Sequence, residues 1–557
     1  MFRAGASRGI RSSILAGNVR FASTTATVTK PSVLLRVWSF TKKATLIGLV
    51  GGTAYIGYKI YDESHPGPQL PQTTTFPNGE PKKTLVILGT GWGSVSLLKN
   101  LDTSKYNVVV VSPRNYFLFT PLLPSIPTGT LDTKLIIEPV RSITRKLKGE
   151  VIYLEAEATD VDVKSKTITL KQSTTVHSGH SGEDSGAFKS VISEKTGVEE
   201  IITKLQYDYL VVGVGAQPST FGIPGVAENS TFLKEVSDST TIRRRIMDQI
   251  EAANMLPVND PERKRLLSVV VCGGGPTGVE TAGEIQDYID QDIKKWMPTI
   301  ALEMSVTLIE AQPHVLSSFN PKLVEYTSEV FEQTNINLKC SSMVKAVDQT
   351  TVTAQHKNKD GTTSVLKVPY GILIWATGNA PRPIVRNLWA QINEQKTAKR
   401  GLLVDDSLLV DGTTDIYALG DCTFTKYAPT AQVAFQEGQF LAKHFDRLQK
   451  IDSLRWRIAH PSVNDNVDRL KAKLEKIESK PSKFEYHNHG ALAYIGSEKA
   501  VADIMVADFS NIQTGGSFTF YLWRSAYIYM CLSIENQFSI ILDWAKVWLF
   551  GRSVSSE

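Results

Sequence analysis

The chain has 557 residues, too many for a single hydrophobic core, and at roughly 100–200 residues per domain this length predicts about three or four domains. Its net charge is +5, yet residues 1–60 alone hold nine Lys or Arg and no Asp or Glu, so the positive charge marks a leader rather than a nucleic-acid-binding surface. The four cysteines lie far apart without a C-x-x-C pair, which argues against a disulfide framework, a zinc site and a redox dithiol.

The N-terminal region has the composition of a mitochondrial targeting sequence. Residues 1–30 carry several Arg among Ser, Thr and Ala, which predicts a transit peptide, with a disordered basic tail as the alternative. Residues 44–61 are largely apolar and predict a membrane anchor. A helix over the uncharged part would span only ~22 Å of a ~30 Å hydrocarbon core, so a packed or interfacial segment stays open. Residues 62–81, rich in Pro, Thr and Gly, predict a linker.

A dinucleotide-binding pattern follows the linker. Residues 84–88 are an apolar run typical of a buried parallel strand, Gly89, Gly91 and Gly93 form a turn, and a helix begins at Ser94. This order lets backbone N–H groups and the helix dipole meet a pyrophosphate. Because glycine turns also serve as plain connectors, one copy alone does not decide the function.

A second copy of this pattern lies at residues 267–284. After an apolar strand over 268–272, Gly273, Gly275 and Gly278 have the G-x-G-x-x-G spacing, and a helix opens at Pro276. Two such turns indicate two nucleotides bound by two domains.

The residues that end the next strands predict how each ribose is held. The strand over 107–111 is followed by Ser112 where an acid is usual, so Ser112 and Arg114 are expected to hold the first ribose. The strand over 305–310 ends on Glu310, which could accept both hydroxyls of an adenosine ribose and would repel a 2′-phosphate. The second site should therefore prefer NADH over NADPH, unless Glu310 is an ordinary strand-end charge.

Later segments predict a flavin and a quinone. Residues 414–421 resemble the short strand by which flavin oxidoreductases place an acid, here Asp421, on the ribityl chain. On the helix expected after Pro429, Gln432 and Gln436 are four residues apart and share a face. Neutral amides suit the two carbonyls of a quinone, whereas the neighbouring Glu437 leaves a solvent-exposed polar face as the alternative.

Other polar segments and the C-terminus complete the chain. His177 and His180 lie in a polar loop without further ligands, and Asp465 and Asp468 lack calcium-loop spacing, so no metal site is predicted. From residue 516 aromatic residues accumulate, and apolar residues over 538–549 follow helical spacing. This pattern predicts a helix lying on a membrane, with a core or dimer helix as the alternative.

Taken together, these motifs resemble the type II NADH dehydrogenases, single-subunit alternative NADH:ubiquinone oxidoreductases of fungal and plant mitochondria. The resemblance covers about residues 82–552 and is carried by GTGWGS (89–94), SPRNYFLFTPLLPS (112–125), GGGPTGVE (273–280), ATGNAPRP (376–383), LGDC (419–422), AQVAFQEG (431–438) and LWRSAY (522–527). The absence of an acid at Ser112 belongs to the pattern of that family.

The resemblance implies an α/β fold with two Rossmann-like dinucleotide-binding domains, as in glutathione reductase, and a C-terminal helical membrane-binding region. The expected boundaries are 82–265 and 381–480 for the FAD-binding domain, 266–380 for the NADH-binding domain and 481–557 for the membrane-binding and dimerisation region. The family pattern implies non-covalent FAD held by Gly89, Thr90, Gly91, Trp92, Gly93, Ser94, Ser112, Arg114, Thr120 and Asp421. It implies NADH held by Gly273, Gly275, Pro276, Thr277, Gly278, Glu280, Glu310, Ala376, Thr377 and Gly378, and ubiquinone bordered by Trp92, Gln432 and Gln436.

The expected function is non-electrogenic transfer of a hydride from NADH to FAD and of two electrons to ubiquinone. The expected protein is a homodimer on the mitochondrial inner membrane, and the segment at 44–61 resembles that of members facing the intermembrane space. The alternatives are another FAD- and NAD(P)H-dependent oxidoreductase of the same fold and a membrane-tethered flavoprotein with little turnover. A disulfide reductase or a sulfide:quinone reductase would need cysteines beside the flavin, and this chain has no such pair.

Overall fold

The computed structural model describes residues 51–52, 54–55, 57–172, 189–193, 200–463, 465–507 and 510–555. The chain divides into two units, residues 1–62 and residues 63–557. In the first unit, the described residues from 51 to 62 are helical. No helix among the described residues is both long and apolar enough to cross a membrane. The predicted transit peptide and half of the segment at 44–61 lie outside the described residues.

The second unit begins with a segment that packs along the first parallel sheet. The side-chain amide of Gln69 donates to the carbonyl oxygens of Thr144 (2.8 Å) and Leu147 (2.9 Å), and Gln72 donates to Val108 (2.9 Å). The segment from residue 63 to 81, predicted as a linker, is therefore hydrogen-bonded to the folded body. Its Pro- and Thr-rich composition gave no sign of these distant partners.

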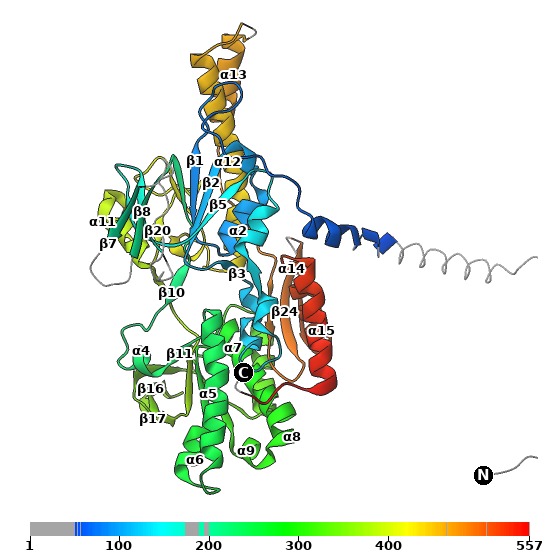
Figure 1. Ribbon diagram of the computed structural model, residues 1–557. Coiled ribbons are helices and arrows are strands. Elements are labelled where there is room, and N and C mark those ends of the chain that lie inside the picture. The colour runs from blue at the N-terminus through cyan, green and yellow to red at the C-terminus, as the bar shows by residue number, and fades with distance from the viewer. Residues whose placement is uncertain are drawn as a thin grey trace, which may run out of the picture. The chain divides into compact units, whose positions relative to one another are not determined.

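The first sheet has eight strands in the order β21-β9-β1-β2-β5-β6-β8-β7 (Figure 1). The five strands from β21 to β5 run parallel, and the pairs β5–β6, β6–β8 and β8–β7 are antiparallel. Helices α2 (Trp92–Asn100) and α12 (Ala431–Ala459) pack on one face and α11 (Pro383–Gln391) packs against β5. The strands are β1 (Thr84–Leu88), β2 (Asn107–Ser112), β5 (Val151–Asp162), β6 (Thr167–Gln172), β7 (Lys189–Ser193), β8 (Glu200–Gln206), β9 (Tyr209–Val212) and β21 (Ile416–Ala418).

The second sheet is fully parallel, with the order β11-β18-β12-β13-β14. Its strands are nearly continuous apolar runs, as expected for a sheet covered on both faces. The strands and main helices are β11 (Thr231–Phe232), β12 (Ser268–Cys272), β13 (Ser305–Ile309), β14 (Ile336–Lys339), β18 (Ile372–Trp375), α5 (Val236–Asn254), α7 (Pro276–Tyr288) and α10 (Pro321–Gln333). An antiparallel sheet of β15 (Ser342–Val347), β16 (Thr351–Lys357) and β17 (Thr363–Pro369) packs beside it.

The chain passes between the two sheets through a two-stranded connection. β10 (Ala216–Pro218) and β19 (Asn379–Pro381) pair antiparallel, one on the way into the second sheet and one on the way back. Because β11 already pairs with β18, the chain enters the second sheet before residue 231, earlier than the boundary expected at 265/266. The return at β19 lies next to the boundary expected at 380/381.

The C-terminal region consists of a small sheet followed by two helices. β23 (Ala491–Tyr494), β24 (Ala500–Ala507) and β25 (Ser510–Gly516) are antiparallel, and α14 (Ser517–Met530) and α15 (Ile534–Phe550) follow. Buried side chains of both helices, among them Trp523, Ile540 and Trp544, belong to the same core cluster as α7 and the second sheet. The α/β class with two dinucleotide-binding sheets and a C-terminal helical region is thus confirmed.

Short elements complete the fold. The strands are β3 (Tyr116–Leu118), β4 (Ile137–Pro139), β20 (Leu402–Leu403) and β22 (Thr423–Phe424), and the α-helices are α3 (Val140–Arg145), α4 (Val226–Asn229), α6 (Pro261–Leu266), α8 (Lys294–Trp296), α9 (Pro298–Glu303) and α13 (Val467–Glu478). Short 3₁₀-helices lie at Thr103–Lys105, Thr120–Ser125, Thr133–Ile136, Asn393–Thr397 and Gly420–Cys422, and a π-helical turn lies at Ile289–Ile293.

Candidate functional site

A cavity of about 1120 Å³ lies where the two parallel sheets meet. The turn after β1 and the turn after β12 both line it, together with the returning segments 213–218 and 375–379 and the loop around Asp421. These are the carboxyl ends of parallel strands, where ligands of open α/β sheets bind. One cavity therefore joins the two predicted nucleotide-binding turns.

The first turn leaves room for a phosphate. Gly89 has φ +99°, and a Cβ there would collide with the backbone of Gly213, so only glycine fits. A Cβ placed on Gly91 would meet no heavy atom within 4 Å, because this residue faces open space. Helix α2 starts directly after Gly91 without a side-chain cap, so its N-terminus is open to an anion.

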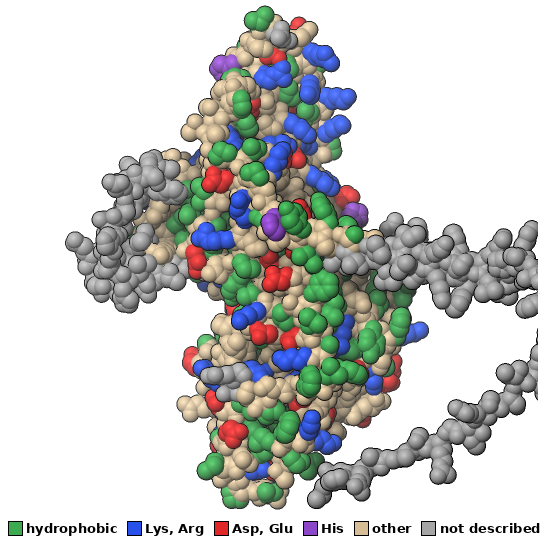
Figure 2. Space-filling view, turned by 45° about the vertical axis from the view of Figure 1, so that its right-hand side comes forward, with side chains coloured by type: hydrophobic (Ala, Val, Ile, Leu, Met, Phe, Trp, Pro, Cys, Tyr) green, Lys and Arg blue, Asp and Glu red, His purple; other side chains and the backbone are tan. Residues whose placement is uncertain are grey.

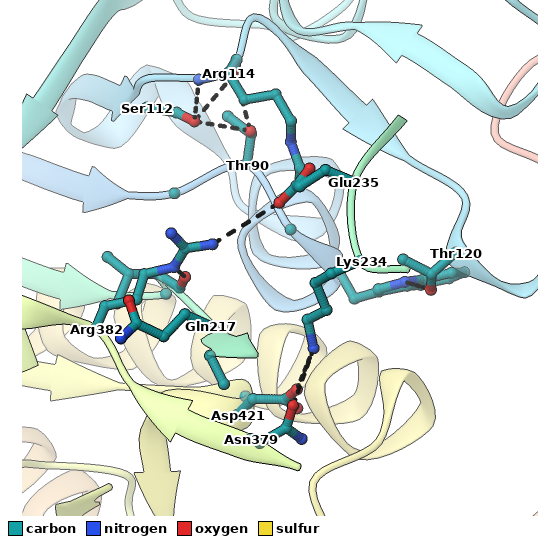
Figure 3. Close-up of a pocket in the computed structure, with 18 of the residues that line it drawn as sticks. Thr90, Ser112, Arg114, Thr120, Gln217, Lys234, Glu235, Asn379, Arg382 and Asp421 are labelled. Carbon is teal, nitrogen blue, oxygen red and sulfur yellow. Dashed lines mark hydrogen bonds and ion pairs between the residues drawn. The ribbon is translucent and has the colours of Figure 1, made fainter. Parts of the chain in front are cut away.

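Hydroxyl groups and one arginine surround the end of β2. The hydroxyl oxygens of Thr90 and Ser112 are 3.1 Å apart, and the backbone N–H of Arg114 donates to Ser112 Oγ (3.2 Å). Arg114 Nη1 forms an ion pair with Glu235 Oε2 at 2.6 Å. Figure 3 shows this group at one end of the cavity. Ser112 and Arg114, predicted to hold a ribose, therefore line the cavity, with Glu235 as an additional partner.

The second turn has the same construction. Gly273 has φ +119°, a Cβ added to Gly275 would meet no heavy atom within 4 Å, and α7 begins uncapped at Pro276. A Cβ on Gly278 would collide with the backbone of Gly273, which explains the third glycine as a close helix–strand contact. The predicted NADH residues that line the cavity are Gly275, Pro276, Thr277, Ala376, Thr377 and Gly378.

Glu310 lies at the end of β13 and is held by the backbone. Its carboxylate accepts the N–H groups of Gly274 (2.5 Å) and Gln312 (2.6 Å). It touches the glycine turn, but it is not among the residues that line the cavity.

Glu280 is turned away from the cavity. Its carboxyl is buried and accepts the backbone N–H of Tyr494 (3.1 Å), and burial raises its pKa to about 8. A residue expected to bind NADH thus makes its contacts with the C-terminal region instead, because the helix α7 face that carries it packs on β23.

Asp421 lines the cavity opposite Lys234. Lys234 Nζ is 3.8 Å from Asp421 Oδ2 and donates to Asn379 Oδ1 (3.2 Å). Figure 3 shows Lys234 extending from the segment before α5 toward both side chains. Lys234, Asn379 and Asp421 come from three separate segments of the chain, so these two contacts link the three segments at the cavity.

Several polar residues at the cavity were not assigned a role from the sequence, among them Lys234, Glu235, Asn379 and Arg382. Glu235 forms a capping box with Asp238 at the start of α5, a pattern that predicts a helix start and no ligand. Arg382 Nε donates to the carbonyl oxygen of Val214 (2.8 Å), and its Nη2 is 3.9 Å from Glu235 Oε1. The motif ATGNAPRP contains Asn379 and Arg382, so it could have indicated them, whereas Lys234 and Glu235 lie in no recognisable motif.

The three residues predicted for the quinone differ in position. Trp92 lines the cavity and donates its indole N–H to Thr120 Oγ1 (3.0 Å). Gln432 and Gln436 share a face of α12 as predicted, but their amides bind the backbone of the segment before β23, at Gly490 (3.2 Å) and His487 (2.7 Å). The structure does not bring the two glutamines to the large cavity.

Glu437 does not form the exposed polar face that was the alternative for this helix. Its side chain is fully buried and accepts the N–H of Gly420 (2.6 Å), and burial raises its pKa to about 7. This hydrogen bond holds the loop that carries Asp421 against α12.

Cysteine and metal chemistry find no support among the described residues. All four cysteines are free, and none of them lines the large cavity. No group of three or more His, Cys, Asp or Glu in the described ranges is arranged to hold a metal ion. His177 and His180 lie outside these ranges.

Comparisons with known proteins agree with this arrangement. The pyridine nucleotide-disulphide oxidoreductase family matches residues 83–438, and the NDH2 C-terminal domain matches residues 488–553. The mitochondrial external NADH-ubiquinone oxidoreductase 2 of Saccharomyces cerevisiae is 49% identical over 515 residues, 92% of this chain and 89% of the yeast protein. The mitochondrial external alternative NADH-ubiquinone oxidoreductase of Yarrowia lipolytica is 47% identical over 93% of this chain and 88% of its own.

A solved structure supports the same relationship. NDH2 of Plasmodium falciparum in complex with NADH has a TM-score of 0.70 and 28% identity, and the match covers 85% of this chain and 100% of that chain. The sulfide:quinone oxidoreductase of Aquifex aeolicus, at 17% identity and a TM-score of 0.56, shares the fold. The resemblance seen in the sequence is confirmed, and the chain belongs to the type II NADH dehydrogenases within the pyridine nucleotide-disulphide oxidoreductases.

Proposed function

We propose that this protein is a mitochondrial NADH:ubiquinone oxidoreductase that transfers electrons without pumping protons. The observation that carries the proposal is the single cavity into which two phosphate-binding turns open, one from each parallel sheet. The names of the yeast relatives, which are external mitochondrial NADH-ubiquinone oxidoreductases, support the same reaction.

FAD fits the first turn and the floor of the cavity. Gly91 leaves space for a pyrophosphate, Ser112 and Arg114 lie where the ribose would be held, and Asp421 can accept a ribityl hydroxyl. Bound there, FAD would supply the redox chemistry, accepting a hydride from NADH and giving two electrons to a quinone. Gly89, Thr90, Trp92, Gly93, Ser94 and Thr120 complete the proposed FAD site.

NADH fits the second turn. Gly275 leaves open space at the N-terminus of α7, and the two segments 375–379 and 275–277 line the cavity on that side. Glu310 positions the turn by holding the N–H of Gly274, and its negative charge disfavours the 2′-phosphate of NADPH. Gly273, Gly278, Ala376, Thr377 and Gly378 shape the turn and the return strand. Glu280 lies on the helix after this turn and faces away from the cavity. It supports the turn by holding α7 against Tyr494.

Ubiquinone is proposed to approach beside Trp92 and the start of α12. Trp92 lies in the cavity wall, and Gln432 and Gln436 hold the segment 487–490 against the same helix. In this proposal the two amides do not contact the quinone directly. They hold the segment 487–490 in place, and that segment shapes the path by which the quinone reaches the cavity.

The exposed apolar side chains of α14 and α15 support attachment to the inner-membrane lipid, and the family resemblance supports a homodimer. The relatives described as external support an enzyme on the outer face of the inner membrane, oxidising cytosolic NADH. Protease accessibility of the C-terminus in mitochondria stripped of their outer membrane would test the orientation. Sedimentation equilibrium of the purified protein would test the dimer.

The central experiment follows the flavin absorbance of the purified protein. We expect NADH to bleach the flavin absorbance and a short-chain ubiquinone to restore it over repeated cycles. A protein that is colourless after refolding with FAD would contradict the proposal. A flavin that NADH reduces and no quinone reoxidises would instead favour a membrane-tethered flavoprotein with little turnover.

A further inference from the structure

A second cavity lies between the C-terminal helices and the π-helical turn at residues 289–293. Its volume is about 250 Å³, below the roughly 300–1000 Å³ of pockets that take drug-sized ligands. Charged residues line one side, and the exposed apolar end of α15 lines the other. The proposed NADH and quinone chemistry uses none of these residues.

Most charges at the cavity are already paired. Arg552 Nη1 forms an ion pair with Asp292 Oδ2 at 2.9 Å and also donates to Gln291 Oε1 (3.0 Å). Arg552 Nη2 is also 3.8 Å from Glu284 Oε2, so this buried cation has two buried acidic partners and forms a fixed wall of the cavity. The pair does not offer a free charge to a ligand.

Arg524 is the exception. Its guanidinium lies over the rings of Phe520 and Trp544, with Cζ at 4.3 Å and 4.6 Å from the ring centroids. Its Nε is buried without a hydrogen-bond partner, and none of the carboxylates in the described part of the chain is within ion-pair distance. Burial lowers the pKa of Arg524, because the loss of water outweighs the opposing effect of the more distant acids Glu284 and Glu498.

Two cations at the cavity, Arg524 and Lys295, form no ion pair in the described part of the chain. Lys295 adds a second cation at the cavity, while Glu498 is the other acid and is exposed to solvent. A guanidinium presents its N–H donors in a planar fork, the geometry that matches a phosphate. The polar side of the cavity therefore suits one small anionic group.

The rim of the cavity is apolar and faces solvent. Trp548, Leu549 and Phe550 line the cavity and are 78%, 62% and 74% exposed. Figure 2 shows hydrophobic side chains at the surface over α14 and α15. A ligand that fills the cavity would place whatever is attached to its anionic group on this apolar rim, so a phosphate with hydrocarbon chains fits both sides.

We propose that this cavity binds the phosphate of an anionic phospholipid, with Arg524 as its principal ligand and the acyl chains lying on the end of α15. The inference deepens the proposed attachment to the membrane and rests on it. A bound lipid would fix the depth and rotation of α14 and α15 at the bilayer, beyond what a non-specific apolar contact provides.

The test uses the full-length, FAD-loaded protein and soluble short-chain lipids, which remove the contribution of membrane surface charge. We expect dihexanoyl phosphatidate to raise the melting temperature in a saturable manner and dihexanoyl phosphatidylcholine to raise it less. The Arg524→Gln variant should bind the phosphatidate about tenfold more weakly, as expected for the loss of a charged hydrogen bond. Lys295→Gln, at the same cavity, should weaken binding by a smaller factor.

Lys546→Gln is the matched control, because it removes one exposed cation from α15 outside the cavity and should leave phosphatidate binding unchanged. Equal weakening by Arg524→Gln and Lys546→Gln would overturn the proposal in favour of general charge attraction. Stabilisation by inorganic phosphate equal to that by phosphatidate would overturn the lipid assignment.

Vesicles separate this proposal from membrane attachment itself. If the protein binds phosphatidylcholine vesicles and phosphatidate neither stabilises it nor strengthens that binding, the cavity is not a lipid site and the attachment stands. If no vesicle binds, the proposed attachment fails as well. The flavin absorbance of each variant reports whether the body has folded.

Discussion

Buried carboxyl groups are the residues whose chemistry departs furthest from the ordinary. Burial raises the pKa of Glu280 to about 8, that of Glu437 to about 7 and that of Asp287 to about 6. Each raised pKa means that the folded protein keeps a proton that the unfolded chain releases at lower pH. At high pH these groups therefore lower the free energy of unfolding and destabilise the protein. This destabilisation disappears as the pH is lowered.

The first prediction concerns Glu280. Its pKa rises from 4.5 in the unfolded chain to about 8, so ionising it in the folded state costs on the order of a few kcal/mol. Glu280→Gln should exceed the wild-type stability only slightly at pH 5, just above the unfolded pKa, and by much more at pH 9, and urea unfolding at both pH values measures this. Glu325→Gln, an exposed acid on α10, is the control and should change neither value.

The same Glu280→Gln variant tests where the residue acts. Because the carboxyl faces Tyr494 and not the cavity, the KM for NADH should stay within about twofold of the wild type. A stability difference that is the same at pH 5 and pH 9 would contradict the assigned ionisation. A large rise in KM would return Glu280 to the nucleotide site.

The second prediction concerns Glu310. Its two oxygens accept two backbone N–H groups, and a glutamine could accept only one of them while its amide group opposes the other. Glu310→Gln should raise the KM for NADH by about tenfold, as expected for the loss of one charged hydrogen bond. The preference for NADH over NADPH should narrow at the same time, because the repulsion of the 2′-phosphate is lost.

The ratio of kcat/KM for NADH and NADPH measures this change. The exposed Glu325→Gln again serves as the control. An unchanged ratio would remove Glu310 from nucleotide recognition and leave it a structural residue of the turn.

At the scale of elements, the two glycine turns should separate the two nucleotides. A Cβ on Gly91 or on Gly275 would meet no protein atom within 4 Å, so alanine should be tolerated by the fold and should fill the space proposed for a phosphate. Gly91→Ala should lower the flavin content without a specific effect on NADH. Gly275→Ala should leave the flavin bound and raise the KM for NADH by about tenfold or more.

Gly67→Ala is the matched control, since Gly67 is exposed and its Cβ would also meet no atom within 4 Å. The ratio of flavin to protein absorbance and the steady-state kinetics are the two measurements. Loss of flavin in both turn variants, or in neither, would argue against one nucleotide per turn.

The elements that the sequence predicted are those with local causes. The strands before each glycine turn are apolar runs of five residues, and their turns need glycine for the reasons that the structure shows at Gly89 and Gly273. Both could be found without knowing what lay nearby in space. The position of Asp421 at the cavity followed from a motif in the same way.

The elements that were missed depend on distant partners. Lys234 reaches the cavity only because β11 joins the second sheet, and nothing near residue 234 in the sequence indicates this pairing. The amides of Gln432 and Gln436 are taken by a segment more than fifty residues away. Their spacing fixed the shared helix face, and the partner on that face could come only from the tertiary structure.

At the scale of the whole molecule, function depends on bringing separate parts of one chain to the same place. The β10–β19 pair sets how the second sheet follows the first within the 63–557 unit, and the cavity exists only between them. The C-terminal helices then cover α7, so the region proposed to bind the membrane and the helix that follows the second glycine turn share one core cluster. A structural change in α14 or α15 can therefore be transmitted through packed side chains to α7 and the glycine turn before it.

This shared core decides how membrane attachment must be tested. Removing residues 520–550 would take Phe520, Trp523, Ile540 and Trp544 out of the core, so such a truncation would destabilise the protein besides releasing it from lipid. The exposed face of the same helices offers a cleaner change. Tyr529 and Leu542 are 86% and 68% exposed and lie outside the small cavity beside Arg524.

The last prediction is that Tyr529→Ser combined with Leu542→Ser weakens binding to phosphatidylcholine vesicles by at least about tenfold, because each apolar side chain contributes on the order of 1.5–3 kcal/mol when fully buried. Cosedimentation with vesicles measures this, and unchanged flavin absorbance shows that the fold is intact. Leu302→Ser, on α9 and 80% exposed, is the control and should bind as the wild type does. If the double variant also binds as before, α14 and α15 meet another protein surface rather than the membrane.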